Sequence, residues 1–402
     1  MSIIKIHINT IPVLKELLCL YNLLKVHGEV KLVGGCVRDM LLGLSPKDID
    51  LATTILPQEV IKILSQNQIK YFPTGLKFGT VTAVINYAIF EITTLRKDVK
   101  TYGRKAEVEF TEEWLEDAKR RDFTVNAIYS SIDGTVVDFF NGIEDLKNKK
   151  IKFIGNAEQR IKEDFLRILR YFRFIAYIGG NNIDENSLAA TIKLRSGLEK
   201  ISGERIKAEM FKLLSNPFAK ESIFLFRKTG IDENIDMPEL YSLPELNFVV
   251  GNVIVNLTLI LKALKISTLD LGKLFERWRL STIERKELSF LKDYQYPWQL
   301  NDEIKLHQRE FYKLRGYFKN AILIKASNEG QEALLVAEDL ISSSTTWYYP
   351  DFPVTGEDLM KLGITGPKIG QIKNILLENW IENDFLDDKS KLLDIAAKIS
   401  LK

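Results

Sequence analysis

Residues 32–53, LVGGCVRDMLLGLSPKDIDLAT, decide the fold of the first third of this chain. Their first residues continue a strand that runs into Gly34–Gly35, and the following residues read as a short helix closed by Gly43. A second strand is expected over residues 48–53. The stretch therefore predicts a strand, a glycine turn, a helix and another strand in close succession.

The glycine turn has the geometry of a phosphate site. Backbone N–H groups and a helix N-terminus at Gly34–Gly35 can receive phosphate oxygens. Arg38, one turn into the helix, is placed to pair with the same phosphates in fork geometry. The alternative interpretation is an ordinary strand-to-helix turn with Arg38 on a solvated face.

Asp48 and Asp50 are two residues apart on the second expected strand, so both side chains should point to one face of the sheet. Two carboxylates on one face suit a pair of Mg²⁺ ions that bridges triphosphate oxygens and a nucleophilic hydroxyl. Asp-x-Asp also occurs on exposed turns, so the pair alone leaves a purely structural interpretation open.

The rest of the sequence divides into two regions of different periodicity. Helical spacing over 11–26, a helix from Pro57 and a hairpin over 78–94 with Asn86–Tyr87 near its turn complete the first region. From about residue 155 onward strand signals nearly vanish and helical periodicity prevails, beginning with a helix expected over 157–178. The expected fold class is α+β, with a mixed head followed by a long helical body.

Composition narrows the class of protein. The chain has 402 residues, which indicates two or three domains, and its net charge of +2 excludes a global polycation. Cys19 and Cys36 form no paired pattern and only three histidines occur, so disulfide, zinc and His/Asp phosphohydrolase frameworks are unsupported. There is no signal peptide pattern and no apolar run of about 20 residues. We expect a cytoplasmic protein with no membrane partner.

Residues 163–173, EDFLRILRYFR, carry a second candidate site. Asp164, Arg167, Arg170 and Arg173 recur every three residues, and on one helix they would form a single slowly rotating face. Cytosine and adenine both present an amino donor beside a ring-nitrogen acceptor, so Asp164 can accept from the amino group while Arg167 donates to the ring. Guanine and uracil reverse this order and would leave both contacts unpaired. The alternative is an amphipathic helix with salt-bridge support.

Residues 32–53 resemble the signature motif of class II tRNA nucleotidyltransferases and their bacterial poly(A) polymerase relatives, within the polymerase-β-like superfamily. The resemblance implies that Asp48 and Asp50 hold metal ions and that Gly34, Gly35 and Arg38 contact the nucleoside triphosphate. Glu91, on a strand that could run beside this pair, matches a third acidic position of the superfamily. A structural glutamate is the other interpretation of Glu91.

Further motifs extend the resemblance. KRRDFTVNAI (119–128) implies that Arg121 contacts the nucleotide and that Asp122 and Asn126 organise the floor of the site. EDFLR is similar to the family's EDxxR element, which implies base reading by Asp164 and Arg167, with Glu163 in support. Arg170 and Arg173 match further nucleotide-binding arginines.

Two more segments match family elements. ISGERIKAEMFKLL (201–214) resembles a helix-stabilising motif in which Arg205 is structural. Residues 95–110 match a flexible loop that the family uses to switch from C to A addition, and Asp98 and Arg104 are the switching residues implied there.

The resemblance implies a polymerase-β-like head with a small mixed sheet, followed by an all-helical neck, body and tail. The expected bounds are 1–150 for the catalytic head, 151–218 for the base-recognising neck, 219–345 for the body and 346–402 for a tRNA-binding tail, with its last helices near 355–362 and 367–382. The implied reaction adds C, C and A from CTP and ATP to a tRNA 3′ end, with contacts to the acceptor and elbow region and a two-Mg²⁺ site. Poly(A) polymerase, an A-only adding enzyme and a non-catalytic RNA-binding module are the alternatives.

Overall fold

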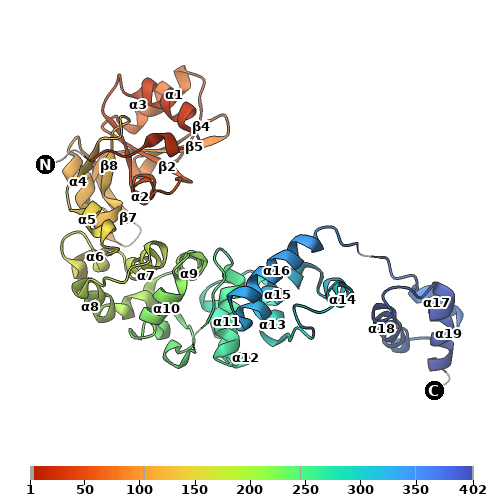
Figure 1. The fold of residues 1–402 in the computed structure, drawn as a ribbon. Helices are drawn as coiled ribbons and strands as arrows, with labels where there is room; N and C mark the ends of the chain where they lie inside the picture. The colour runs from red at the N-terminus through yellow and green to blue at the C-terminus, as the bar shows by residue number, and fades with distance from the viewer. Residues whose placement is uncertain (1–3, 103–104, 245, 349, 401–402) are drawn as a thin grey trace. The chain divides into compact units, whose positions relative to one another are not determined.

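The computed structural model describes residues 4–102, 105–244, 246–348 and 350–400. The chain forms two compact units. The first comprises residues 1–243 and 266–280, and the second comprises residues 244–265 and 281–402. Figure 1 shows the strands confined to the first part of the chain and helices throughout the rest, as the sequence predicts. The finer division into head, neck, body and tail stays a prediction.

A seven-stranded mixed sheet forms the framework of the first unit, in the order β3-β4-β5-β2-β1-β8-β9. Of its described strand pairs, β2–β5 is parallel and the others are antiparallel. The expected hairpin is confirmed, because Asn86 and Tyr87 form its turn with φ of 47° and 69°. The strands are β1 Val30–Val33, β2 Ile49–Thr53, β3 Lys70–Gly75, β4 Thr80–Ile85, β5 Ala88–Thr94, β8 Ile128–Ser130 and β9 Val136–Asp138.

Helices cover the two faces of the sheet unequally. α1 (Leu14–Leu24), α2 (Gly35–Leu41) and α3 (Pro57–Gln66) pack apolar side chains against one face in a large core. On the other face a smaller core gathers Val33, Ala52 and Tyr129 under the short helix α4 (Trp114–Lys119). The second core lies over β1, β2 and β8, so it does not extend across the whole sheet.

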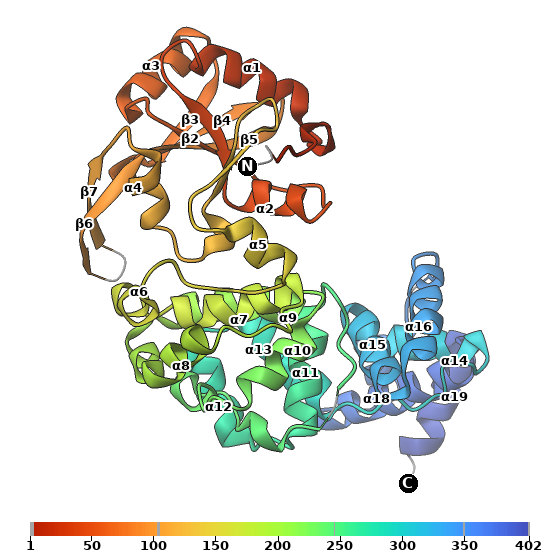
Figure 2. The ribbon, with the colours of Figure 1, turned by 60° about the vertical axis from the view of Figure 1, so that its left-hand side comes forward.

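Residues 95–110, where the resemblance implies a flexible loop, contain a hairpin, and the flexibility and switching role of this segment stay predictions. β6 (Arg96–Tyr102) and β7 (Lys105–Phe110) pair antiparallel as a separate two-stranded sheet beside α4 (Figure 2). The β propensity of this stretch comes from Val99, Thr101, Tyr102, Val108 and Phe110. Arg104 lies outside the described residues, as does the side chain of Asp98.

The helices beyond the sheet of the first unit correct one prediction. Residues 157–178 do not form one helix, since α6 ends at Glu163, Asp164 is extended with φ −154° and ψ 106°, and α7 begins at Arg167. Asp164 therefore does not share a helical face with the arginines. The remaining α-helices of this unit are α5 Gly142–Lys147, α6 Ala157–Glu163, α7 Arg167–Ile178, α8 Glu185–Lys193, α9 Gly203–Ser215, α10 Ala219–Phe226 and α12 Thr268–Arg277. Short 3₁₀ turns lie at η1 Ile8–Thr10, η2 Leu76–Phe78, η3 Thr124–Asn126, η4 Arg195–Lys200, η5 Asp232–Ile235 and η6 Leu240–Ser242.

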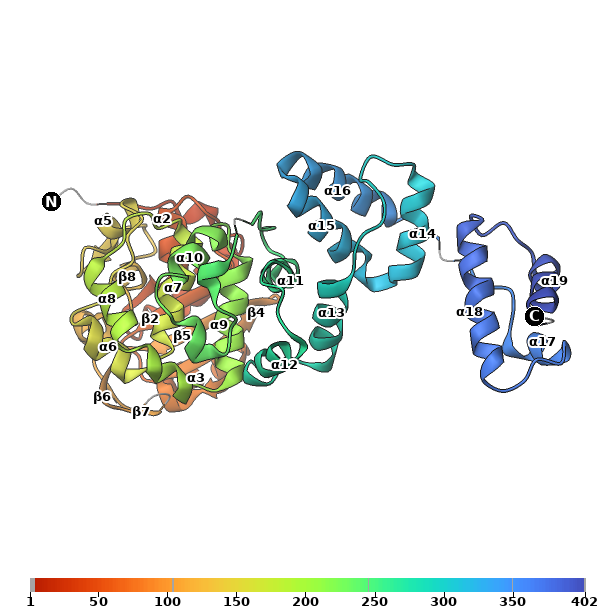
Figure 3. The same cartoon turned by 90° about the horizontal axis from the view of Figure 1, so that it is seen from below.

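The second unit is helical over its described residues. Its last three helices pack together around Leu359, Leu376, Trp380 and Leu392 (Figure 3). The sequence predicts the first two of these helices but misses α19. The elements are α11 Val253–Ala263, α13 Thr282–Asp293, α14 Ile304–Leu314, η7 Arg315–Tyr317, α15 Phe318–Glu329, α16 Gln331–Ser344, α17 Gly356–Lys361, α18 Pro367–Glu382 and α19 Lys389–Ser400. In the described part of the chain, no helix has the length and apolar character needed to cross a membrane.

Candidate nucleotide-binding site

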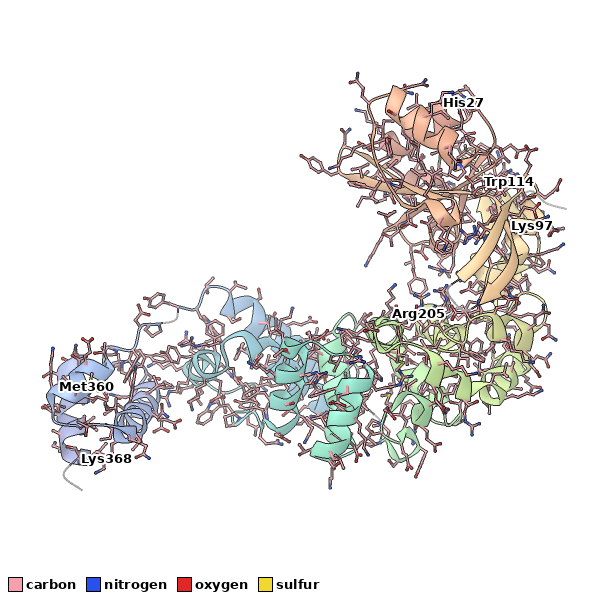
Figure 4. All side chains as sticks on the ribbon, turned by 180° about the vertical axis from the view of Figure 1, so that it is seen from behind. His27, Lys97, Trp114, Arg205, Met360 and Lys368 are labelled. Atoms are coloured by element: carbon pink, nitrogen blue, oxygen red, sulfur yellow. The ribbon has the colours of Figure 1, made fainter. Side chains whose placement is uncertain are left out.

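A cavity of about 690 Å³ lies within the first unit, where the glycine turn and β2 meet the helices α7 and α9. Figure 4 labels Arg205 on α9, on the side of the helices that faces the sheet. The cavity brings together most of the residues singled out from separate motifs. Its lining comprises Gly34, Gly35, Arg38, Asp48, Asp50, Arg121, Asp122, Asn126, Asp164, Leu166, Arg167, Arg170, Arg173, Phe174, Tyr177, Arg205, Lys212, Ser215 and Asn216.

The lining is strongly polar and carries an excess of positive charge. Seven lysine or arginine side chains and four aspartates face the cavity. Its volume falls within the range of about 300–1,000 Å³ that is usual for small-molecule sites. A triphosphate, with several negative charges, matches this excess of cations. Of the predicted site residues described, Glu91 and Glu163 are not part of the lining.

The glycine turn leaves space where a side chain would meet arginines. Gly34 has φ 70°, a conformation that favours glycine, and a Cβ there would lie 3.5 Å from Arg121 Nη1. A Cβ on Gly35 would lie 3.6 Å from Arg38 Nη2. Two guanidinium groups therefore lie within contact distance of the positions that side chains on the turn would occupy.

Arg38 is held in place before any ligand binds. Its Nη1 donates to Asn126 Oδ1 at 2.7 Å, and its Nη2 donates to Asp39 Oδ1 at 2.8 Å. Its guanidinium also lies 4.7 Å from the ring centroid of Tyr177, whose hydroxyl donates to the same Asp39 oxygen at 2.8 Å. These contacts hold the Arg38 side chain in place, and the residue is only 8% exposed. The alternative interpretation of Arg38 as a residue on a solvated face is therefore wrong.

The two carboxylates occupy different environments. Asp48 is exposed and immediately precedes β2, one residue outside the strand predicted for it, whereas Asp50 is half-buried within β2. Burial, together with the charges of Glu91 and Asp48, raises the pKa of Asp50 to about 6 despite nearby Arg121 and Arg38. Neither carboxylate accepts a side-chain hydrogen bond from the described residues. The negative charge at Asp50 is thus incompletely compensated, as expected of a cation site.

Glu91 lies beside Asp50 without joining it in a three-carboxylate cluster. The two residues are partners in the parallel β2–β5 register. Among the described residues, no group of three or more histidine, cysteine or acidic side chains is close enough to hold a metal ion. Whether Glu91 binds metal stays a prediction.

Arg121 is anchored by a buried carboxylate that the sequence analysis did not single out. Asp117, on α4, accepts from Arg121 Nη2 at 3.0 Å, from Arg120 Nε at 2.8 Å and from the hydroxyl of Tyr129 at 2.7 Å. It also accepts from the backbone N–H of Arg96 at 3.3 Å, at the start of the β6–β7 hairpin. Although burial opposes this, the adjacent guanidinium groups hold the pKa of Asp117 at about 2.

A buried network links the floor of the cavity to α7. Asn126 accepts from Arg38 and donates its Nδ2 to Asp122 at 3.0 Å. Asp122 in turn accepts from Arg170 Nε at 2.8 Å. Burial alone would raise the pKa of Asp122, but Arg170 and Asn126 outweigh it and lower that pKa. This chain of contacts explains how residues from two distant motifs are kept at fixed positions.

Asp164 and Arg167 both line the cavity, but different helices hold them. Arg205 on α9 donates Nη2 to Asp164 Oδ2 at 2.6 Å and Nη1 to Asp164 Oδ1 at 3.2 Å. Arg167 donates to Glu163 at 2.5 Å and to the backbone oxygen of Arg160 at 2.8 Å. Glu163 therefore acts behind Arg167, outside the cavity.

Arg173 is crowded by like charges. Burial and the neighbouring Arg170 lower its pKa to about 10, although Glu209 on α9 lies 3.1 Å from its Nε. An anionic ligand in the cavity would relieve this repulsion. Asp117, Tyr177 and Glu209 were missed from the sequence because each acts through a partner that only the fold brings near.

Comparisons with known proteins agree with this geometry. The family model described as "Poly A polymerase head domain" matches residues 30–152. The model described as "Probable RNA and SrmB- binding site of polymerase A" matches residues 180–243. The first match contains the glycine turn, the carboxylates and the Arg121 motif.

Curated relatives match over a longer stretch. "CCA tRNA nucleotidyltransferase 1, mitochondrial" of Mus musculus is 37% identical over 392 residues, which cover 93% of this chain and 88% of the relative. The CCA-adding enzyme of Geobacillus kaustophilus is 38% identical over 55% of this chain and 54% of its own length. The crystal structure of the Bacillus stearothermophilus CCA-adding enzyme in complex with CTP has a TM-score of 0.80 and 25% identity, and covers 97% of this chain and 98% of that one. The chain belongs to the tRNA nucleotidyltransferase and poly(A) polymerase family.

Proposed function

We propose that the protein adds C, C and A to the 3′ end of tRNA, using CTP and ATP and no nucleic-acid template. The observation that carries the proposal is the single cavity in which the Asp48–Asp50 pair, six arginines and Asp164 meet. The relatives named as CCA-adding enzymes support the same activity. The solved relative in complex with CTP supports nucleotide binding in a fold of this kind.

Asp48 and Asp50 suit a pair of Mg²⁺ ions. Their carboxylate oxygens are hard ligands, and the raised pKa of Asp50 reflects negative charge that a cation would balance. Bound there, Mg²⁺ would supply the positive charge that activates the 3′-hydroxyl and neutralises the phosphoryl group under attack. The chain's own residues then have to orient the triphosphate and select the base.

The arginines divide these tasks by position. Arg38 and Arg121, which flank the bare backbone at Gly34 and Gly35, would orient the triphosphate. Arg170 and Arg173 on α7 would add cationic contacts, while Asp122 and Asn126 keep Arg170 and Arg38 in position.

Base selection rests on Asp164 and Arg167. Asp164 would accept from the amino group of cytosine or adenine, and Arg167 would donate to the neighbouring ring nitrogen. UTP and GTP present the opposite order, so each would leave both protein groups unpaired in a partly dehydrated cavity. In this proposal Arg205 and Glu163 hold the two reading groups and do not touch the base themselves.

The domain bounds and the cellular location of the protein are also proposals. We assign residues 1–150 to the catalytic head, 151–218 to the neck, 219–345 to the body and 346–402 to a tRNA-binding tail. A cytoplasmic location stays a prediction, since the names of relatives include the word mitochondrial.

The decisive experiment supplies the purified full-length chain with tRNAs that end before the first C, after CC or after a complete CCA, together with each NTP in turn. The expected products are addition of C, C and A to the first tRNA, A to the second and nothing to the third. Long A tails would identify a poly(A) polymerase, and A addition without C addition would identify an A-only enzyme.

A matched variant separates catalysis from RNA binding. Asp48→Ala should abolish incorporation while the affinity for tRNA, measured by filter binding, remains within about twofold, because the exposed carboxylate serves the metal site and not the fold. Retained incorporation would refute the proposed metal role. RNA binding without incorporation by the unsubstituted chain would favour a non-catalytic binding module.

A further inference from the structure

Half of one sheet face carries exposed side chains directly beside the catalytic carboxylate. Asp50 is the register partner of Glu91, Glu91 that of Thr82, and Thr82 that of Phe72. Directly opposed residues on neighbouring strands point to the same face of a sheet. The four side chains therefore form a row that runs from the carboxylate across β5 and β4 to the edge strand β3.

The outer part of this row bears an apolar surface. Phe72 is 42% exposed, and Ile89, which lies two residues before Glu91 on the same face, is 61% exposed. Lys70 lies on the same face of β3 as Phe72, with its Nζ 5.2 Å from the Phe72 ring centroid. An aromatic ring, an aliphatic side chain and an ammonium group thus share one open surface, which we call the β3–β5 face.

The rest of the same sheet face is covered. Val33, Ala52 and Tyr129, on β1, β2 and β8, pack under α4 in the smaller core. Asp50 stands where the covered half ends and the β3–β5 face begins. The smaller core accounts for the covered half of this sheet face, but packing within the unit does not require the other half to be exposed.

The geometry of nucleotidyl transfer indicates which substrate lies against the β3–β5 face. The nucleotide cavity touches Asp50 together with Arg121 and residues of α7 and α9, but includes no residue of β3, β4 or β5. In nucleotidyl transfer the attacking and leaving oxygens lie roughly in line through the phosphorus. The attacking 3′-hydroxyl therefore approaches Asp50 from the side away from the triphosphate, and the open β3–β5 face lies on that side.

We propose that the β3–β5 face holds the single-stranded 3′ end of the acceptor RNA, with Phe72 as a stacking platform for one of its bases. The proposal rests on the proposed function, because the occupant is the substrate whose hydroxyl reaches Asp50. Aromatic rings and nearby cations are the usual means of holding unpaired bases without reading their sequence. Such tolerance suits an acceptor whose final nucleotide changes with each addition.

The dimensions agree with the length of an unpaired end. Phe72 stands three strands away from Asp50, or about 14 Å at the usual spacing of about 4.8 Å. A stacked strand rises about 3.4 Å per nucleotide. An extended, unstacked strand spans about twice that distance per nucleotide, so the ring lies about two to three nucleotides from the reacting hydroxyl. A tRNA that already ends in CC has three unpaired nucleotides at its 3′ end and therefore reaches the ring.

The test compares Phe72→Ala with the unsubstituted enzyme on a tRNA that ends in CC, with ATP as the nucleotide. Loss of stacking should raise KM for tRNA about five- to one-hundredfold for Phe72→Ala, while KM for ATP and kcat at saturating tRNA stay within about twofold. Phe72→Trp should keep the KM for tRNA of the unsubstituted enzyme, because tryptophan also provides an aromatic surface. Val26→Ala is the matched control, since Val26 is 73% exposed and follows α1, which covers the opposite sheet face.

A binding measurement removes the dependence on turnover. In the Asp48→Ala background, Phe72→Ala should raise the Kd for fluorescein-labelled tRNA that ends in CC, and Val26→Ala should not. An unchanged Kd and KM for Phe72→Ala would refute the role of the β3–β5 face. If the unsubstituted chain extended no tRNA at all, the proposed function itself would be wrong and this inference would fall with it.

Discussion

Asp117→Asn tests the idea that a buried carboxylate in α4 positions Arg121. The substitution keeps the shape of the side chain and removes its charge. Asp117 is only 1% exposed and pairs with Arg120, Arg121 and the hydroxyl of Tyr129. Removing the charge therefore leaves two largely buried guanidinium groups without their carboxylate partner.

The structure gives the size of the effect. A pKa of about 2 in the folded chain, in place of the ordinary 3.8, corresponds to about 2.4 kcal/mol of stability at about 1.36 kcal/mol per unit of pKa. Because the folded-state pKa lies below the unfolded one, this stabilisation is complete above about pH 4 and is lost as the pH falls toward 2. For a unit of this size, the unfolding midpoint at pH 7 should fall by about 5–10 °C.

Activity should change in a way that simple destabilisation would not produce. With Arg121 no longer held, KM for CTP should rise about tenfold at a temperature where the variant is fully folded, while KM for tRNA stays unchanged. Differential scanning calorimetry and steady-state kinetics measure the two effects. Glu116→Gln on the same helix is the control, because its ion pair with Lys119 is open to solvent.

The positioning role of Asp117 would be refuted by either of two results. One is an unfolding midpoint equal to that of Glu116→Gln. The other is a destabilised variant whose KM for CTP is unchanged, which would confine Asp117 to the stability of α4.

Two further substitutions test the carboxylate site and the base-reading pair. Asp50→Asn should abolish transfer but stabilise the metal-free protein at pH 7.5, raising its free energy of unfolding by up to about 3 kcal/mol and with it the unfolding midpoint. The reason is that the folded-state pKa of about 6 exceeds 3.8, so the wild type loses stability as the pH rises between these values. Thermal unfolding in EDTA measures this, the gain should vanish below about pH 4, and a lowered midpoint at pH 7.5 would contradict it. Arg205→Met should free the carboxylate of Asp164 and reduce the preference for CTP over UTP by about tenfold, with KM for tRNA unchanged. Unaltered discrimination in competition assays would show that Arg205 has no part in base selection.

Local signals were sufficient to predict much of the head. The strand, glycine turn and helix around Gly34–Gly35 and the hairpin at Asn86–Tyr87 were predicted because turn residues and alternation act within a few positions. The glycine turn and the helix after it also contain Gly34, Gly35 and Arg38, which line the cavity. The parallel pairing of β2 with β5, by contrast, joins segments some forty residues apart and has no local signature.

The break at Asp164 shows why the rest could not be predicted. Residues 157–178 carry nearly continuous helical periodicity, which predicts one helix. The interruption coincides with hydrogen bonds from Arg205, forty-one residues later in the sequence, so tertiary contacts override the local pattern. Asp117 escaped notice for a related reason, since an acidic residue in a short helix resembles a solvated one until Tyr129 and Arg121 fold against it.

The separation of Asp164 and Arg167 onto different supports has a consequence for how specificity can be altered. Arg167 is the first residue of α7 and pairs with Glu163 at the end of α6, whereas Asp164 is held by Arg205 on α9. The distance between acceptor and donor is therefore a property of how two helices pack, and it is not fixed by spacing along one backbone. A substitution buried between α7 and α9, far from any nucleotide, would widen or narrow that distance and shift substrate preference. Libraries aimed at new nucleotide analogues should accordingly include the interior face of α9 as well as the reading residues.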